Sequence, residues 1–247
     1  MPIVRRLVAT GLPALLVILG GCEDAPHDTA PPPPARVEIP LGDVEGGRAS
    51  LTRNLYVVFD GSGSMGDPLG AECRGDKSFR SKIDGAKWAL RQFLTHVPDD
   101  VNLGLWIFDS AGSREAVPLG ADNRDAFLRA VQDIRAGGGT PLAESMHEGI
   151  DRLIAQYKQQ LGYGEFRLVV ITDGEATGKR IVYATDHAAE LGIPIYTIGL
   201  CIGADHALRK YSVSYRAADS IADLAQGLAD TLAETPSFDP RVFVGPK

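Results

Sequence analysis

The sequence has few of the residues that build soft-metal sites or disulfide frameworks, with 3 cysteines and 5 histidines among 247 residues. It contains neither a Cys-x-x-Cys pair nor a His-x-x-x-His pair, so the sequence does not predict a zinc site. Acidic residues also outnumber basic ones, so the formal net charge is −7. A surface of that sign repels phosphate backbones, and we therefore expect no nucleic-acid partner.

The sequence also lacks an apolar run long enough for a comfortable membrane span, which needs about 20 residues. The N-terminal apolar run covers residues 7–19, follows Arg5 and Arg6, and ends at Gly20-Gly21-Cys22. This order resembles the signal of a bacterial lipoprotein. We interpret residues 1–21 as a signal peptide and Cys22 as the lipidated first residue of the mature chain. A signal peptide with a chance cysteine is the alternative.

A lipid anchor would place the chain in the bacterial cell envelope. Acyl chains on Cys22 bury CH₂ groups worth about 0.8 kcal/mol each, so the attachment would be stable. In lipoproteins of this kind, an aspartate directly after the cysteine favours retention in the inner membrane. Here that position is Glu23, which favours the outer membrane or the periplasmic side. Residues 22–50 lack apolar periodicity and include Pro31-Pro32-Pro33-Pro34, so we expect an extended tether there.

Strand-like and helix-like segments alternate from residue 51 to residue 234, and residues 235–247 show no clear element. Continuous apolar runs predict buried strands at 55–59, 101–108, 166–172 and 194–200, with a short strand at 212–216. Helical spacing of apolar residues predicts helices near 79–97, 122–134, 141–157, 179–191 and 221–232. This alternation predicts one α/β domain with a doubly wound, Rossmann-like open sheet, mostly parallel, and helices on both faces.

Local signals predict where two of these helices start. Asp122 is a candidate N-cap for the helix that carries Phe127. Pro141 stands at a natural first helical position before Leu142.

Five oxygen-bearing residues lie where predicted strands end or where a glycine-rich loop enters a helix. They are Asp60, Ser62, Ser64, Thr140 and Asp173. The carboxyl ends of parallel strands share one edge of an open α/β sheet, where ligands bind. The neighbouring glycines allow the tight turns that would aim these side chains at one point. Because the set offers only oxygen, it suits a hard cation such as Mg²⁺ and not zinc.

The motifs around these residues resemble the metal-ion-dependent adhesion site of the von Willebrand factor A (VWA) domain family. The matching runs are Asp60-Gly61-Ser62-Gly63-Ser64-Met65, Gly138-Gly139-Thr140-Pro141-Leu142 and Ile171-Thr172-Asp173-Gly174. The resemblance covers about residues 51–234 and implies the VWA fold. It also implies Mg²⁺, with Mn²⁺ or Ca²⁺ as alternatives, held by the two serines and the threonine. The aspartates would often act through water, and a carboxylate from a protein partner would take the sixth position.

The resemblance therefore implies a binding protein and not an enzyme: a lipid-anchored domain that holds a partner with an exposed Asp or Glu. An assembly or regulatory subunit of an envelope complex, using the same site, is the alternative. A Mg²⁺-dependent hydrolase is more remote. Haloacid-dehalogenase-type phosphatases need a second acid two positions after the first aspartate, where this chain has Ser62. No Gly-x-Ser-x-Gly motif surrounds Ser62 or Ser64.

Cys73 and Cys201 remain once Cys22 is assigned to the lipid. The envelope permits disulfides, and both cysteines follow predicted strands at the edge that carries the metal residues. We therefore expect a bridge at the rim of the site, and two independent thiols are the alternative.

Overall fold

The computed structural model describes residues 39–42, 44–69, 79–174, 179–202, 207–210, 212–218 and 220–232. The chain divides into two units, Met1–Pro33 and Pro34–Lys247, and all described residues lie in the second. The predicted signal peptide, Cys22 and the C-terminal tail lie outside the described residues. Among the helices that are described, none combines the length and apolarity that crossing a membrane requires.

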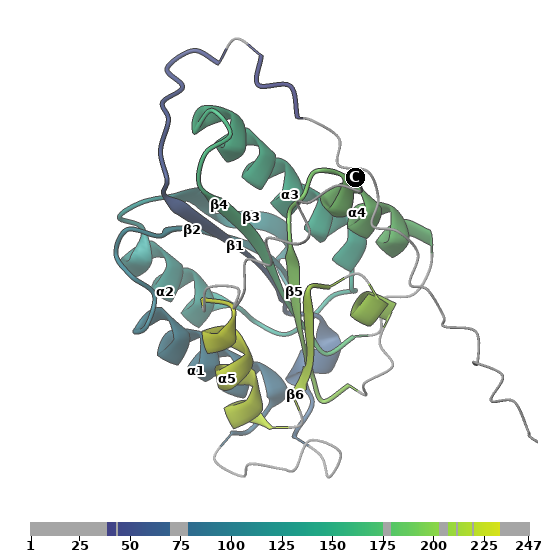
Figure 1. Ribbon diagram of the computed structural model, residues 1–247. Coiled ribbons are helices and arrows are strands. Elements are labelled where there is room, and N and C mark those ends of the chain that lie inside the picture. The colour runs from purple at the N-terminus through teal and green to yellow at the C-terminus, as the bar shows by residue number, and fades with distance from the viewer. Residues whose placement is uncertain are drawn as a thin grey trace, which may run out of the picture. The chain divides into compact units, whose positions relative to one another are not determined.

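A six-stranded sheet with the order β3-β2-β1-β4-β5-β6 forms the centre of the second unit (Figure 1). Five strands run parallel to one another, and β3 pairs antiparallel with β2 at one edge. The strands are β1 Arg53–Asp60, β2 Asn102–Asp109, β3 Gly112–Gly120, β4 Glu165–Thr172, β5 Ile195–Leu200 and β6 Ser214–Ala218. The predicted mostly parallel sheet is confirmed.

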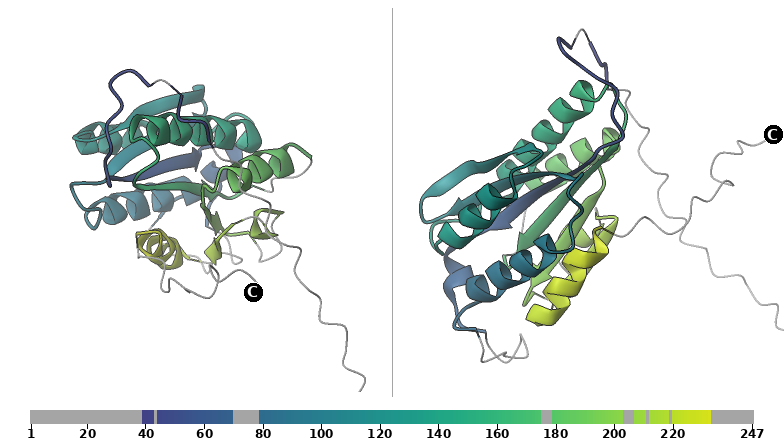
Figure 2. Two further views of the ribbon diagram at one scale, coloured as in Figure 1. Left: turned by 45° about the horizontal axis from the view of Figure 1, so that its top comes forward. Right: turned by 90° about the vertical axis from the view of Figure 1, so that its left-hand side faces the viewer.

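Helices cover both faces of this sheet (Figures 1 and 2). The helices of one layer are α1 Lys82–Leu94, α2 Arg124–Asp133 and α5 Ile221–Asp230, and those of the other are α3 Leu142–Gln159 and α4 Lys179–Glu190. Two short 3-10 helices, η1 Gly63–Gly66 and η3 Ala207–Lys210, lie in loops. The doubly wound arrangement is therefore confirmed.

Strand β1 shows why continuous apolar runs form the middle of the sheet. Val57 and Phe59 join the core beneath α1, α2 and α5, whereas Tyr56 and Val58 join the core beneath α3 and α4. Because side chains alternate between the two faces of a strand, both sets must be apolar when helices cover both faces. All four residues are fully buried.

The sequence patterns did not predict β3. In this strand Val117 is the one buried residue, and Pro118 interrupts the pattern. Register shifts around Leu105 also break its pairing with β2. Edge strands tolerate proline and exposed side chains because one side of the strand has no partner to pair with. A search for apolar runs or strict alternation therefore passes over this element.

Both predicted helix starts are wrong in detail. The N-cap of α2 is Asn123, and Asp122 stands outside the helix with a φ of 54°. The Asn123 amide group donates to the carbonyls of Leu103 (2.6 Å) and Pro118 (3.0 Å). This residue therefore ties the loop to the sheet instead of capping the helix with its side chain. Pro141 is the N-cap of α3 and not its first helical residue.

Candidate metal site

Strand register brings the two predicted aspartates to one edge of the sheet. Asp60 ends β1, and Asp173 follows directly after β4. Phe59 pairs with Ile171, so Asp60 lies beside Thr172. The Thr172 hydroxyl donates to Asp60 Oδ2 at 2.6 Å. Asp60 is completely buried, and it therefore forms the buried base of the candidate site.

The two serines connect Asp60 with Asp173. The Ser62 amide donates to Asp60 Oδ1 at 2.8 Å, and the Ser62 and Ser64 hydroxyl oxygens lie 3.2 Å apart. The Ser64 hydroxyl donates in turn to Asp173 Oδ1 at 2.8 Å. Ser62 and Asp173 are buried, whereas Ser64 is exposed. The four residues thus form a continuous chain of polar contacts between the two buried carboxylates, and Ser64 is its exposed member.

The glycine-rich loop carries Thr140 to the same place. The Gly63 amide donates to the Gly138 carbonyl at 3.3 Å, which joins this loop to the serine segment. Gly138 has a φ of 80°, in the left-handed region that favours glycine. A Cβ added to Gly174 would lie 3.3 Å from Thr140 Cγ2 and 3.5 Å from Asp60 Oδ2. Thr140 and Asp60 therefore flank the same point.

The structure thus gathers all five predicted site residues from three separate segments. The gathered atoms are carboxylate and hydroxyl oxygens, which are the donors that Mg²⁺ prefers. Asp60 and Asp173 are buried, while Ser64 and Thr140 are exposed to solvent. The residues present therefore fit a hard cation that a second molecule can approach from the exposed side.

The charge of the site depends on two carboxylates and one ammonium group. Burial raises the pKa of Asp60, hydrogen bonds from Ser62 and Thr172 lower it in part, and the charge of Asp173 raises it again. Lys82, the first residue of α1, places its Nζ 2.9 Å from Asp173 Oδ2. One unit of negative charge stays unneutralised when both aspartates are ionised. A divalent cation would relieve that imbalance.

Sequence reasoning missed Thr172 and Lys82 as parts of the site. Thr172 precedes Asp173 at the end of β4, and that position next to a predicted ligand was a usable signal. Lys82 belongs to none of the three motifs, and its contact with Asp173 depends on how α1 packs against the sheet edge. We find no sequence signal for it.

Asp109, at the end of β2, binds the segment that leads into the glycine-rich loop. Its carboxylate accepts hydrogen bonds from the Arg114 guanidinium (2.7 and 3.2 Å) and from the amides of Ala111 (2.8 Å) and Arg135 (3.3 Å). Burial would raise the pKa of Asp109, but these hydrogen bonds outweigh it and hold that pKa below its usual range. Because Arg135 leads directly into the glycine-rich loop, Asp109 helps to position Thr140.

Of the three cysteines, one is among the described residues. Cys201 follows directly after β5 and is disulfide-bonded. Its amide donates to the carbonyl of Ala218, at the end of β6, at 2.9 Å. Cys73 lies outside the described residues, so the bridge between Cys73 and Cys201 stays a prediction.

Solved structures share this arrangement of strands and helices. A variant of the PilB minor pilin from Streptococcus sanguinis aligns with a TM-score of 0.57 at 14% identity, covering 80% of this chain and 64% of that chain. The pilus adhesin SpaC from Lactobacillus rhamnosus GG aligns with a TM-score of 0.56 at 17% identity, covering 75% of this chain and 31% of that chain. At such identities the likeness shows the fold alone.

Sequence comparison adds a curated relative and a family model. The uncharacterized protein YwmD of Bacillus subtilis is 28% identical over 137 residues. That match spans 50% of this chain and 56% of the relative, so this chain corresponds to little more than half of that protein. The model of the von Willebrand factor type A domain matches residues 54–226, a range that contains all five gathered residues. The chain therefore belongs to the von Willebrand factor type A domain family, whose members commonly mediate adhesion between proteins.

Proposed function

We propose that this chain is a lipid-anchored envelope protein whose VWA domain binds a protein partner through a Mg²⁺-dependent adhesion site. The observation that carries the proposal is the layering of the five gathered residues. Buried carboxylates, Asp60 and Asp173, lie beneath the exposed hydroxyl groups of Ser64 and Thr140. A site built in this way can hold a cation and still present it to another molecule.

The residues of the site would divide the work between them. Ser62, Ser64 and Thr140 would hold the ion through neutral hydroxyl oxygens, and the two aspartates would balance its charge directly or through water. When bound in such a shell, Mg²⁺ keeps much of its positive charge and attracts a further carboxylate. The exposure of Ser64 and Thr140 gives an Asp or Glu of a partner access to the open side.

We also propose that the chain is not an enzyme. A phosphatase that uses Asp60 as its nucleophile would need a general acid two positions later, and Ser62 does not ionise at neutral pH. A screen of phosphate esters in the presence of Mg²⁺ tests this statement. Turnover by the parent chain that disappears in the Asp60→Ala variant would contradict it.

The binding proposal is tested by crosslinking the full-length chain to a bacterial envelope extract, once with Mg²⁺ and once with a chelator. The expected result is one set of partners that requires Mg²⁺ and is lost in the Thr140→Ala variant. Ser113→Ala is the matched control, because Ser113 is an exposed hydroxyl residue on β3. This control should capture the same partners as the parent.

A second arm tests the chemistry of the partner. The carboxylates of the extract are first converted to amides, which removes their charge while leaving other side chains intact. This treatment should abolish the Mg²⁺-dependent capture. Capture that survives the chelator, the Thr140→Ala change and amidation alike would refute the mechanism.

A further inference from the structure

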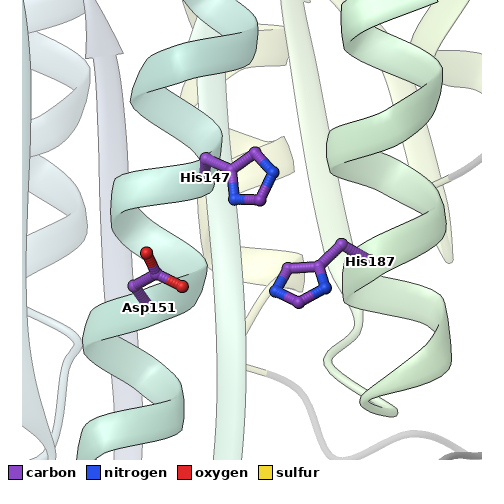
Figure 3. A group of neighbouring side chains, drawn as sticks. All are labelled: His147, Asp151 and His187. Atoms are coloured by element: carbon purple, nitrogen blue, oxygen red, sulfur yellow. The ribbon is translucent and has the colours of Figure 1, made fainter.

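A second group of metal-binding side chains lies between α3 and α4, outside the five residues of the adhesion site. His147 and Asp151 come from α3, and His187 comes from α4 (Figure 3). One ligand atom from each residue lies within 4.8 Å of the other two. The imidazole rings have their centroids 5.0 Å apart. We refer to these three residues as the His–Asp–His cluster.

Helix geometry explains why these side chains meet. His147 and Asp151 stand four residues apart, so they project from the same face of α3. That face packs beside α4, which brings the ring of His187 opposite both residues, as Figure 3 shows. Tyr183 lies one turn before His187, and its ring lies 5.3 Å from the ring of His147. The histidine rings are half-buried, and Asp151 is exposed.

The three side chains have no other polar partner in the part of the chain that the structure describes. Two arginines of the same helices bind acidic residues outside the cluster. Arg180 binds Glu144 across the same helix pair at 2.6 Å, and Arg152 binds Glu115 on β3 at 3.1 Å. The cluster therefore keeps its nitrogen and oxygen atoms available, and the exposed salt bridge of Arg180 joins the same two helices.

We propose that the His–Asp–His cluster binds a divalent transition-metal ion of the zinc type. Two imidazole nitrogens and one carboxylate oxygen form a three-ligand set that zinc accepts, with water or another side chain in the fourth position. Zinc bonds of about 2.0–2.1 Å in tetrahedral geometry place ligand atoms about 3.4 Å apart. Small side-chain rotations would close the observed spacing, and both imidazole rings can turn because neither forms a hydrogen bond with a described residue.

The two metal sites of the domain would select different ions. The adhesion site offers oxygen alone and suits Mg²⁺, whereas imidazole favours zinc and its neighbours in the transition series. His147 stands five residues after Leu142, the first residue of α3, which is about 7.5 Å along the helix at the helical rise. Metal at the cluster would link α3, which follows the Thr140 loop, to α4. The cluster is thus a separate site, which lies between α3 and α4 and not at the edge of the sheet.

The sequence shows no local motif for this site, because its histidines belong to different helices. No His-x-x-x-His pair exists, and pairs across elements leave no local motif. The spacing of His147 and Asp151 on one predicted helix was the available signal. The expectation that the sequence predicts no zinc site rested on local motifs alone.

The test is a titration of the full-length chain, purified without a polyhistidine tag, with Zn²⁺ in excess Mg²⁺. Calorimetry should show one tight Zn²⁺ site per chain, and Co²⁺ should give the visible absorption bands of a tetrahedral ion. His147→Gln and His187→Gln should each weaken binding by at least about 100-fold, because losing even an outer-shell partner costs about 10–100-fold. His96→Gln, which changes an exposed histidine in the turn after α1, is the matched control and should not alter Zn²⁺ binding. Ser62→Ala should also leave Zn²⁺ binding intact, because it alters the other site.

A second measurement needs no variant, in case a substitution impairs folding. Zn²⁺ should protect His147 and His187 of the parent chain against diethyl pyrocarbonate, and should leave His96 reactive. The proposal is overturned if folded His147→Gln and His187→Gln variants bind Zn²⁺ like the parent. It is equally overturned if the parent shows neither Zn²⁺ binding in excess Mg²⁺ nor protection of the two histidines.

Discussion

Each buried carboxylate at the carboxyl edge of the sheet accepts hydrogen bonds from its own set of donors. Asp60 accepts from an amide and a hydroxyl group, and Asp173 accepts from a hydroxyl group and the Lys82 ammonium. Asp109 accepts from the guanidinium of Arg114 and from two amides. An unpaired buried charge costs several kcal/mol. These donors therefore let the edge form with its acids in place before any cation arrives.

Lys82 competes with the proposed cation for Asp173, and Lys82→Met should make Mg²⁺ bind about tenfold more tightly or better, because a positive charge leaves the site. The same change should lower the stability of the metal-free chain by about 3 kcal/mol, because Asp173 loses its charged partner. Mg²⁺ calorimetry and thermal unfolding with and without Mg²⁺ measure both effects. The control is Arg91→Met, which removes an exposed positive charge from the same helix. Equal Mg²⁺ affinity in the Lys82→Met variant and the parent would show that Lys82 and the ion do not share the site.

The pair of Asp109 and Arg114 should make stability depend on pH in acid. The folded-state pKa of Asp109 is lowered, so the pair stabilises the chain above the unfolded pKa of about 3.9 and loses that contribution as the pH falls through the folded pKa. Arg114→Gln should cost about 1 kcal/mol at about pH 7, since Arg114 is partly exposed and screened. Urea unfolding should show this difference shrinking below about pH 4. Arg129→Gln on α2 is the control, and a difference that stays constant with pH would contradict the argument.

At the scale of elements, burial on two faces decides what a sequence can reveal. The central strands were predictable because their residues pack against helices on both sides, which requires continuous apolar runs. Strand β3 was not predictable, because an edge strand with Pro118 carries no such pattern. The meeting of the five residues of the candidate site was predictable because strand ends and glycine-rich loops are visible in sequence. Lys82 and His187 were not, because their contacts arise from helix packing between distant segments.

The pairing of β1 with β2 leaves no room for a side chain at Gly104. Gly104 lies opposite Tyr56 in the register, and an added Cβ would lie 2.3 Å from Tyr56 Cδ2. Because this ring is completely buried, Gly104→Ala should destabilise the chain by about 1–3 kcal/mol. Urea denaturation measures the effect. Gly120→Ala on β3 is the matched strand control, since its Cβ would meet no atom within 4 Å; equal stability of the two variants would mean that the ring moves aside at little cost.

At the scale of the whole molecule, the proposed anchor and the proposed adhesion site would have separate tasks. Residues 22–50 would connect the lipid to the domain as a tether, while the carboxyl edge of the sheet would face a partner. A tether raises the local concentration of the domain near the membrane without adding any contact. Membrane attachment and Mg²⁺ binding should therefore be separable by substitution.

Cys22→Ser tests this separation, because it removes the thiol that would carry the acyl chains. We expect the parent chain to sediment with membranes and to incorporate labelled palmitate, and the variant to appear in the soluble fraction without label. Mg²⁺ affinity should be the same in both, since the five site residues lie in the folded domain. Cys201→Ser is the cysteine control: it should keep the label and the membrane fraction, although it loses a disulfide and therefore some stability. A parent chain that takes up no palmitate, or a Cys22→Ser variant that sediments with membranes as the parent does, would show that Cys22 is not the anchor.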